Sequence, residues 1–386
     1  MKAEQLALQR KRYAHLSDEE WRWMLQQVEG RQRTCDKLPT FAEIDDWWYP
    51  VRLSCEQCSS EITARYKASL LPTTPFTLID LTGGYGVDTF FMSERATQAH
   101  YVERNEELCR IASHNFGLTR PQLQIHHADA ICFLEQMPSC DVIYLDPARR
   151  DQNGGKVFRL EDCEPNVVEL LPTLTAKSKQ LMVKLSPMLD ITQALRSLPM
   201  SFDVHIVAVK NEVKEVLLVQ TDGEPTIHAV NLSPTTQQTF SFTQEEEKKT
   251  PPNLPFGGEG LSPLKGEMEG VIYEPNAAII KAGAFKLVAQ RYGLYKMAPN
   301  THLYLSDQLI EDFPGRVWQI LEINPKDMKQ IPGANILTRN YPLTPEQLRK
   351  KLKIKDSDTH TIIGARLAEK PILLLAKRIN QHTTSC

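Results

Sequence analysis

The sequence has few cysteines, and its N-terminal end lacks a long apolar run. Residues 1–12 are polar and mixed in charge, with no apolar stretch long enough for a signal peptide or a membrane span. Only Cys55 and Cys58, of eight cysteines, form a close pair, and no second C-x-x-C or H-x-x-H motif stands at zinc-site spacing. We therefore expect a cytoplasmic protein with reduced thiols, no membrane contact and no metal.

Positive charge is unevenly distributed along the chain. The formal net charge is −3, but residues 276–386 hold 17 Lys and Arg residues against 9 Asp and Glu residues. This C-terminal excess of +8 leaves −11 for the remainder of the 386 residues. A split of this kind indicates that one part of the protein meets a polyanion. The length allows two or three domains, each with its own core.

Four motifs in a fixed order mark apolar strands that end in acidic or glycine-rich turns. They are LIDLTGGYG at 78–86, YVERN at 101–105, HHADA at 126–130 and VIYLDPARR at 142–150. An open α/β sheet presents its ligand groups at the carboxyl ends of its strands, so these turns predict one binding edge. The predicted strands are residues 77–81, 99–103, 123–127, 141–145, 180–185, 203–210 and 214–220, with helices between the first six.

The last two of these strands are connected too closely for a parallel crossover. Only a few residues around 211–214 separate them, so they must pair antiparallel. A parallel sheet closed by an antiparallel seventh strand is the methyltransferase version of the doubly wound fold. We therefore predict an α/β, Rossmann-like methyltransferase sheet of seven strands.

A glycine-rich turn and a later carboxylate predict a nucleoside cofactor. Gly83, Gly84 and Gly86 follow the first strand and bring bare backbone close to a ligand at a helix N-terminus. Glu103 lies 23 positions after Asp80, at the end of the second strand, where a carboxylate can bind ribose hydroxyls. Dinucleotide sites share both features. Alternatively, the glycines only form a tight turn and Glu103 is a solvated strand end.

The third strand ends in Asp129, which can accept a hydrogen bond from an adenine amine. The same residue can cap the helix that follows, and both roles can hold together. The predicted cofactor-binding residues are Asp80, Thr82, Gly83, Gly84, Gly86, Asp88, Glu103, Asp129 and Asp146.

In a methyltransferase sheet of this kind, we expect the turn after the fourth strand to face the methyl group of the cofactor. Asp146 can accept a hydrogen bond from the target and direct the lone pair of the target atom towards a sulfonium methyl carbon. Methyl transfer is an in-line displacement from an activated donor, so positioning supplies most of the catalysis. We predict Asp146, Pro147 and Arg149 as catalytic residues. The alternative is an Asp-Pro turn that only ends the strand.

Basic residues follow this turn at once and suit a phosphate-bearing substrate. The predicted substrate-binding residues are Arg150 and Lys156, beside a loop that contains two glycines, and Lys184 at the end of the fifth strand. A solvated basic loop is the alternative interpretation of the first two.

With these residues in view, the chain resembles a bacterial family of class I S-adenosylmethionine-dependent methyltransferases with a C-terminal THUMP-like domain. The resemblance extends over nearly the whole chain. It is carried by SSEITARYK at 59–67, LTGGYGVD at 81–88, DPARR at 146–150, the stretch from YEPNA at 273–277 to residue 285, and that from RNYPL at 339–343 to residue 355. It implies S-adenosylmethionine as cofactor. Because THUMP domains bind RNA, it also implies methylation of structured RNA, tRNA or rRNA, held by the basic C-terminal part.

Domain limits follow from the patterns and the resemblance together. Ser17 and Glu20 form a capping box that predicts a helix in the N-terminal region, and residues 275–292 predict another helix. Residues 226–232 and 239–243 are candidate strands, and residues 245–270 predict a flexible insertion without fixed structure. We expect an N-terminal helical region at 1–75, a methyltransferase domain at 76–222, a linker at 223–270, a ferredoxin-like segment at 271–315 and a THUMP-like domain at 316–386.

Other functions stay open at this point. They are an RNA-binding or assembly module whose S-adenosylmethionine pocket has no turnover, an NAD-linked oxidoreductase, and methylation of a small molecule or a protein. The antiparallel last strands and the Asp-Pro-Ala-Arg turn argue against the oxidoreductase.

Overall fold

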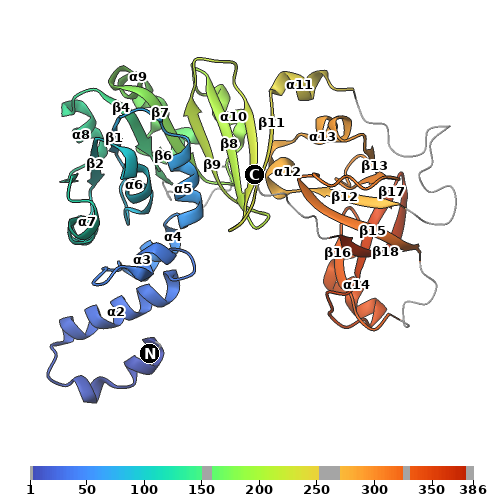
Figure 1. Ribbon diagram of the computed structural model, residues 1–386, viewed down its shortest axis with the longest axis horizontal. Helices are drawn as coiled ribbons and strands as arrows, with labels where there is room; N and C mark the ends of the chain where they lie inside the picture. The colour runs from blue at the N-terminus through green and yellow to red at the C-terminus, as the bar shows by residue number, and fades with distance from the viewer. Residues whose placement is uncertain (1–2, 150–158, 252–269, 325–330, 380–386) are drawn as a thin grey trace. The chain divides into compact units, whose positions relative to one another are not determined.

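The computed structural model describes residues 3–149, 159–251, 270–324 and 331–379. The chain divides into two compact units, of which unit 1 comprises residues 1–205 and 214–225 and unit 2 comprises residues 206–213 and 226–386 (Figure 1). The division falls within strand β8, Phe202–Val209. Each unit is described by itself.

Seven adjacent strands of the first sheet follow the order β8-β9-β7-β4-β1-β2-β3, and β8 crosses the division between the units. Strands β3, β2, β1, β4 and β7 are parallel, and β9 pairs antiparallel with β7. All seven predicted strands are confirmed, as is the antiparallel seventh strand. Their bounds are Thr77–Asp80 for β1, Gln98–Glu103 for β2, Leu123–His127 for β3, Cys140–Leu145 for β4, Ser178–Leu185 for β7, Phe202–Val209 for β8 and Glu212–Gln220 for β9.

Burial explains why these strands can be predicted from the sequence. Leu78, Ile79, Val142 and Ile143 are at most 1% exposed, because the central parallel strands are covered on both faces and are therefore continuously apolar. The connecting helices are α6 Val87–Met92, α7 Glu106–Thr119, α8 Ala130–Gln136, α9 Val167–Lys177 and α10 Ile191–Arg196, with short 3-10 helices at Ser93–Arg95 and Leu160–Asp162. The short strands β5 Ala148–Arg149 and β6 Cys163–Glu164 pair with each other and were not predicted.

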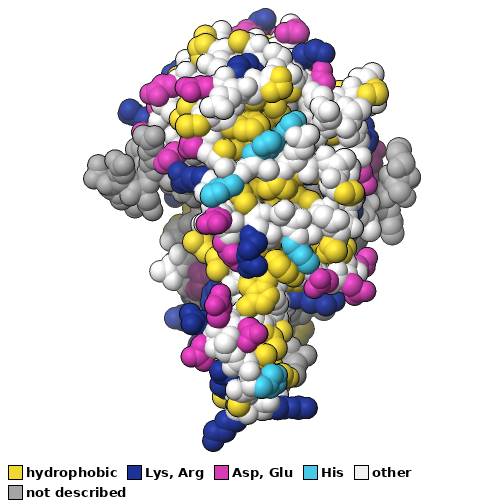
Figure 2. Space-filling view, turned by 90° about the vertical axis from the view of Figure 1, so that its left-hand side faces the viewer, with side chains coloured by type: hydrophobic (Ala, Val, Ile, Leu, Met, Phe, Trp, Pro, Cys, Tyr) yellow, Lys and Arg dark blue, Asp and Glu magenta, His cyan; other side chains and the backbone are white. Residues whose placement is uncertain are grey.

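The N-terminal helices pack on this sheet layer as part of unit 1. The predicted capping box is confirmed, with Ser17 at the N-cap of α2. The ring of Phe41 lies 4.9 Å from that of Phe90 in α6, measured between ring centroids, so aromatic packing holds this region. The helices are α1 Ala3–Ala7, the 3-10 helix Arg10–Tyr13, α2 Asp18–Thr34, α3 Pro39–Glu43, α4 Arg52–Gln57 and α5 Glu61–Ser69. On the face shown in Figure 2, acidic and basic side chains are interspersed with exposed hydrophobic ones.

Unit 2 contains a hairpin and a second sheet. The two candidate strands there are confirmed as β10 Ile227–Leu232 and β11 Gln237–Phe242, and the structure pairs them antiparallel. The second sheet has the order β13-β14-β12-β15-β18-β17-β16, in which the pairing of β16 with β17 is parallel. Its strands are β12 Val271–Pro275, β13 Tyr295–Lys296, β14 Tyr304–Ser306, β15 Gly315–Ile323, β16 Asn335–Thr338, β17 Thr361–Leu367 and β18 Lys370–Ile379, with helix α14 at Pro345–Leu352.

Two predictions in unit 2 need correction. The helix predicted at 275–292 is two helices, α12 Ala277–Ala282 and α13 Phe285–Arg291, because Gly283 ends α12 in the left-handed region at φ +76°. The prediction of a flexible insertion at 245–270 was wrong for its first residues, because Gln244–Lys249 form helix α11 with its own capping box. Residues 252–269 of that prediction lie outside the described residues.

Candidate active site

One pocket of unit 1 brings the predicted cofactor residues together. It has a volume of about 610 Å³ and lies at the carboxyl ends of β1, β2, β3 and β4. Parallel strands carry ligand groups at this edge. All nine predicted cofactor-binding residues line it: Asp80, Thr82, Gly83, Gly84, Gly86, Asp88, Glu103, Asp129 and Asp146. The sequence therefore located one continuous site, although the role of each side chain there stays a prediction.

The glycine turn between β1 and α6 is packed too closely for side chains at Gly83 and Gly86. A Cβ on Gly83 would lie 2.2 Å from the ring of Tyr101, and a Cβ on Gly86 would lie 2.7 Å from the ring of Phe116. Gly84 and Gly86 also adopt left-handed backbone, at φ +56° and +85°. A Cβ on Gly84, which lines the pocket, would instead make only an ordinary contact, with the carbonyl oxygen of Thr82 at 3.8 Å. Bare backbone at Gly84 is thus left facing a ligand-sized space.

The carboxylate of Glu103 is held in place by two backbone N–H groups. Gly84 N donates to one of its oxygens at 2.9 Å, and Asn105 N donates to the other at 2.8 Å. Each carboxylate oxygen can accept more than one hydrogen bond, so both can still receive ribose hydroxyls. The fixed carboxylate is preorganised for that contact.

Asp129 caps helix α8, as the alternative interpretation proposed. Its Oδ1 accepts from the backbone N–H groups of Ile131 and Cys132 at 2.9 and 3.3 Å. The residue is exposed and lines the pocket. Capping occupies one oxygen and leaves the adenine role untested.

Asp80 is a buried lining residue of the pocket and connects two of its turns. Its carboxylate accepts from the Thr82 N–H at 2.9 Å and from the Thr89 hydroxyl. Thr82 Oγ1 in turn accepts from Asp146 N at 2.6 Å, which joins the glycine turn to the turn after β4. Burial raises the pKa of Asp80 to about 7, although the hydrogen bonds from Thr89 and Thr82 oppose this rise.

Asp146 forms an ion pair with Lys184 and is the more exposed of the two residues. The side chain of Asp146 is 38% exposed, whereas that of Lys184 is 14% exposed. Burial alone would lower the pKa of Lys184, but the carboxylates of Asp146, Asp88 and Glu215 outweigh burial and raise it. The predicted substrate residue Lys184 therefore contacts a predicted catalytic residue.

The remaining predicted catalytic and substrate residues are placed only in part. Pro147 is buried directly after Asp146. Arg149 belongs to β5, whose backbone pairs with Cys163 of β6. Arg150 and Lys156 lie outside the described residues.

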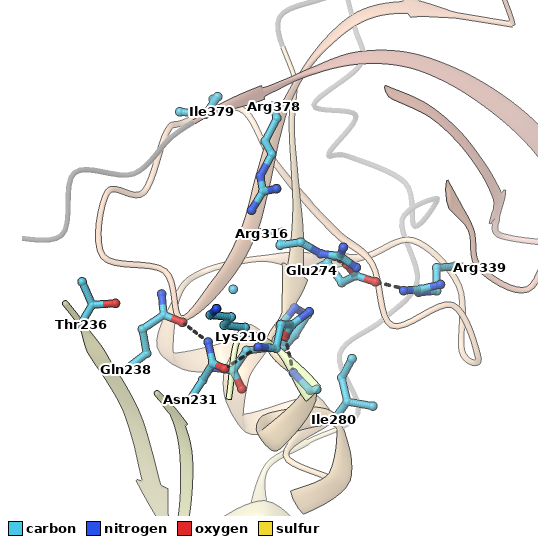
Figure 3. Close-up of a pocket in the computed structure, with 15 residues that line it drawn as sticks. Lys210, Asn231, Thr236, Gln238, Glu274, Ile280, Arg316, Arg339, Arg378 and Ile379 are labelled. Carbon is cyan, nitrogen blue, oxygen red and sulfur yellow. Dashed lines mark hydrogen bonds and ion pairs between the residues drawn. The ribbon is translucent and has the colours of Figure 1, made fainter. Parts of the chain in front are cut away.

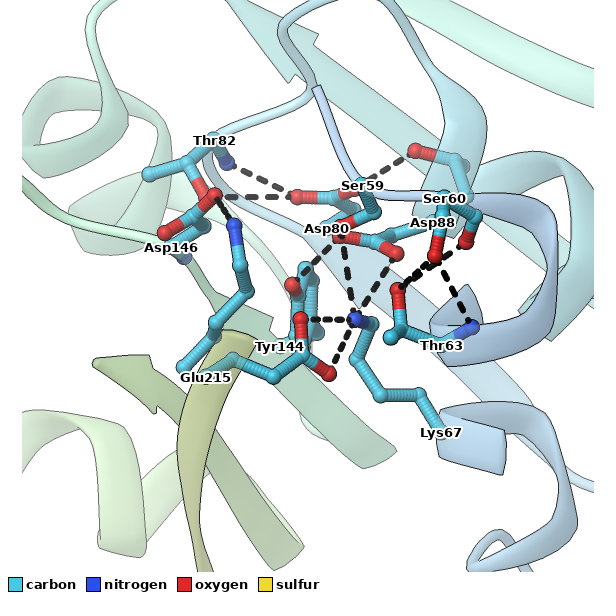
Figure 4. A network of polar contacts seen from close by, with 12 residues as sticks. Ser59, Ser60, Thr63, Lys67, Asp80, Thr82, Asp88, Tyr144, Asp146 and Glu215 are labelled. Atoms are coloured by element: carbon cyan, nitrogen blue, oxygen red, sulfur yellow. Dashed lines mark hydrogen bonds and ion pairs between the residues drawn. The ribbon is translucent and has the colours of Figure 1, made fainter. Parts of the chain in front are cut away.

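A buried network of charges, which the sequence did not predict, lies behind the pocket (Figure 4). Lys67 of α5 is fully buried, and its Nζ lies 2.7 Å from Glu215 and 3.2 Å from Asp88. The hydroxyls of Ser59 and Tyr144 donate to Asp88 at 2.8 and 2.7 Å. Burial would raise the pKa of Asp88, but the ammonium groups of Lys67 and Lys184 keep it lowered. Asp88 is therefore a charged residue with internal partners.

The N-terminal region forms one wall of the pocket, and the sequence gave no local signal for this. The lining residues that were missed there are Leu53, Ser54, Gln57, Cys58 and Ser59. Ser59 and Lys67 belong to the SSEITARYK stretch that carries the family resemblance. That resemblance was the one signal in the sequence that could have placed this region at the pocket.

The described residues hold no group of His, Cys, Asp and Glu side chains suited to a metal ion. Cys55 and Cys58 are free, and burial raises the pKa of Cys55 to about 12, which keeps its thiol protonated. Among the described helices, none combines the length and apolar character needed to cross a membrane.

The pocket residues fit S-adenosylmethionine, the cofactor that the resemblance implies. Bare backbone at Gly84 leaves room for a ligand, and the fixed Glu103 carboxylate suits ribose hydroxyls. Asp146 also lines the pocket, and its N–H donates to Thr82 next to the glycine turn. When bound, this cofactor supplies an electrophilic methyl group on a sulfonium centre.

Comparison with known proteins agrees with this geometry. Residues 272–314 match a ferredoxin-like domain family, and residues 315–378 match a THUMP domain-like family. A crystal structure of a candidate methyltransferase from Porphyromonas gingivalis W83 is 35% identical, with a TM-score of 0.84 over 95% of this chain and 92% of that one. An uncharacterized S-adenosylmethionine-dependent methyltransferase of Mycobacterium tuberculosis is 21% identical over 89% of this chain and 92% of its own length.

The match to the Porphyromonas structure extends over both units, and the two family matches identify the C-terminal segments. The cofactor follows from the mycobacterial relative, whose name states its dependence on S-adenosylmethionine. The chain is an enzyme that belongs to the class I S-adenosylmethionine-dependent methyltransferases with a C-terminal THUMP-like domain.

Proposed function

We propose that this methyltransferase modifies structured RNA, tRNA or rRNA, in the cytoplasm. The observation that carries the proposal is the basic surface of the THUMP-like segment. Lys350 and Lys351 on α14 and Lys353 and Lys355 just after it are all exposed. A row of exposed lysines suits phosphate contacts, which supply most of the affinity of RNA-binding proteins.

Arg349 differs from its lysine neighbours. Its guanidinium pairs with Asp356 at 2.8 Å and donates to the carbonyl of Ala334 at 3.3 Å. It therefore supports the fold of the segment, and we assign the RNA contacts to the four lysines instead. Residues 316–386 would accordingly hold RNA, while residues 76–222 carry out the chemistry.

Within the pocket, we propose that the glycine turn and Glu103 hold the nucleoside part of the cofactor. Asp129 contacts the adenine amine from the rim. Asp146 accepts a hydrogen bond from the target group of the RNA and so orients the lone pair that attacks the methyl carbon. Pro147 limits the freedom of this turn, and Arg149, Arg150 and Lys156 contact substrate. Lys184 holds the carboxylate of Asp146 in position through the ion pair.

Two measurements test this function. Purified enzyme with S-adenosylmethionine that carries a labelled methyl group is incubated separately with total RNA, cell protein and small metabolites. We expect label in a tRNA or rRNA fraction. Mass spectrometry of RNA nucleosides from cells with and without the enzyme then identifies the modified nucleoside. Label in protein or metabolites alone, with unchanged RNA nucleosides, would show that the substrate is not RNA.

A further inference from the structure

A second cavity lies wholly within unit 2 and shares no lining residue with the candidate active site. Its volume is about 920 Å³, within the range of small-molecule and nucleotide sites. Three segments meet around it: the turns of the β8–β9 and β10–β11 hairpins, the ferredoxin-like segment and the THUMP-like segment (Figure 3). Such a meeting point of separate segments is a common place for a ligand.

The lining is strongly cationic. It contains four basic side chains, Lys210, Arg316, Arg339 and Arg378, and one carboxylate, Glu274. Arg316 and Arg339 both pair with Glu274, which is 2% exposed. In the described part of the chain, Arg378 and Lys210 pair with no carboxylate, and both are exposed. The cavity therefore retains a positive charge that its own residues do not neutralise.

The turn that carries Lys210 is held in place by hydrogen bonds. Lys210 and Asn211 form the tight β8–β9 turn in left-handed backbone, at φ +50° and +67°. Asn211 N donates to Asn231 Oδ1 at 2.8 Å, and Asn211 Oδ1 accepts from Ala277 N at 2.7 Å. Positive φ at both central residues is the usual geometry of a two-residue hairpin turn. The turn and its hydrogen bonds thus fix the backbone from which Lys210 borders the cavity.

A neutral donor adds an independent sign of a ligand. Asn276 lines the cavity, is 1% exposed, and accepts from Ile279 N at 3.1 Å through Oδ1. Its Nδ2 is buried and has no hydrogen-bond partner among the described residues. A buried donor left without an acceptor is unfavourable by about 1–3 kcal/mol. An anionic oxygen that reached the base of the cavity would satisfy it.

We propose that this cavity binds the phosphate group of a nucleotide, either within an RNA or as a free nucleotide. Guanidinium groups match phosphate oxygens with paired hydrogen bonds, and amide N–H groups complete such sites. Arg378 and Lys210 supply the uncompensated charge, Arg316 and Arg339 supply charge buffered by Glu274, and Asn276 supplies the neutral donor. In Figure 3 the guanidinium of Arg378 points towards the region between Arg316 and Lys210.

The test compares Arg378→Gln with Lys370→Gln in the full chain. Both residues lie on β18 and both changes remove one exposed positive charge, but the two positions are separated by about 27 Å of strand. Binding is measured with three probes: inorganic phosphate and adenosine monophosphate by calorimetry, and a short fluorescein-labelled RNA by anisotropy. We expect Arg378→Gln to weaken binding at least about tenfold, as for a lost charge-assisted hydrogen bond, and Lys370→Gln to change it less than about twofold.

Asn276→Asp gives a second variant that keeps the helix cap, since Asp caps helices as well as Asn. It replaces the free donor with a carboxylate oxygen, so binding of every phosphate probe should fall by at least about tenfold while the melting temperature is kept. If the cavity binds the labelled RNA but not adenosine monophosphate, its natural ligand is an RNA phosphate. If it binds adenosine monophosphate but not the RNA, its ligand is a free nucleotide. The proposal fails if the parent binds none of the probes, or if Arg378→Gln and Lys370→Gln behave alike. Phosphate binding without RNA methylation would instead contradict the proposed substrate and leave the cavity assignment intact.

Discussion

The ammonium of Lys67 lies 2.7 and 2.8 Å from the two carboxylate oxygens of Glu215, a residue 148 positions later in the chain. This pair joins helix α5 of the N-terminal region to strand β9, the antiparallel strand of the sheet. Both side chains are at most 3% exposed. The N-terminal helices are therefore anchored to the catalytic sheet through charge as well as through aromatic packing.

Lys67→Met should destabilise unit 1 strongly. It leaves Glu215 and Asp88 as buried carboxylates that have lost their shared cation, and breaking a buried pair in this way lowers the free energy of unfolding by roughly 3–5 kcal/mol. Chemical denaturation measures the loss. Arg33→Met serves as the control, because its pair with Glu29 is over a third exposed on both sides and should contribute less than about 1 kcal/mol. Equal losses in the two variants would contradict the anchoring role.

Asp146→Ala should abolish methyl transfer while S-adenosylmethionine still binds. The change removes the acceptor proposed to orient the target, whereas the glycine turn and Glu103 stay in place. Calorimetry gives the cofactor affinity, and transfer of a labelled methyl group gives turnover. Full turnover in this variant would remove Asp146 from the mechanism.

Gly84→Val and Glu103→Ala should each weaken S-adenosylmethionine binding at least about tenfold. Valine at Gly84 would fill space beside the pocket and must adopt left-handed backbone, which is unfavourable by roughly 1–2 kcal/mol. Glu103→Ala removes the fixed acceptor and frees the Gly84 N–H. Calorimetry on both variants, compared with Lys370→Gln as an unrelated change, checks this. Unchanged affinity in both would place the cofactor elsewhere.

The stability of unit 1 should fall as pH rises from about 4 to 7, partly through Asp80. Its pKa is about 7 in the folded state against about 4 unfolded, so across this window the folded state holds the proton more tightly. Raising the pH removes that advantage, by up to roughly 4 kcal/mol. Asp80→Asn cannot titrate and should flatten this part of the profile.

Asp141→Asn is the control for this pH profile. The hydrogen bond from Lys179 lowers the pKa of Asp141 to about 2, so its stabilising effect is present above about pH 4 and is lost only below that. The slope between pH 4 and 7 should therefore be unaffected by Asp141→Asn. A slope that survives in Asp80→Asn would show that other groups cause it.

Neutralising Lys350, Lys351, Lys353 and Lys355 to Gln should weaken RNA binding and flatten its salt dependence by about one unit of slope per lost phosphate contact. S-adenosylmethionine binding should stay the same. Anisotropy at several salt concentrations provides the measurement. An affinity and slope equal to those of the parent would identify these lysines as an ordinary solvated surface.

The sheet of unit 1 could be predicted because its strands are short apolar runs that end in recognisable turns. The strand-end side of the pocket followed from these turns, whereas the wall formed by the N-terminal region did not. Helix α11 was not predicted, because its charged sequence has no apolar face, although Thr243 and Glu246 form a capping box at its start. It is held instead by distant contacts such as Glu247, which accepts from the backbone N–H groups of Lys286 and Leu287 at 3.1 and 2.9 Å. The same holds for Lys67, whose partners are far away in sequence.

The two units alternate along the polypeptide, since residues 206–213 belong to unit 2 and residues 214–225 return to unit 1. A genetic crossover after residue 225 would therefore transfer the C-terminal unit without Lys210 and Asn211. The recipient protein would lose the hydrogen bond from Ala277 N to Asn211 Oδ1 and one cation of the second cavity. Shuffling of the whole of unit 2 between genes would thus require three breakpoints, at residues 205/206, 213/214 and 225/226, which favours inheritance of both units together.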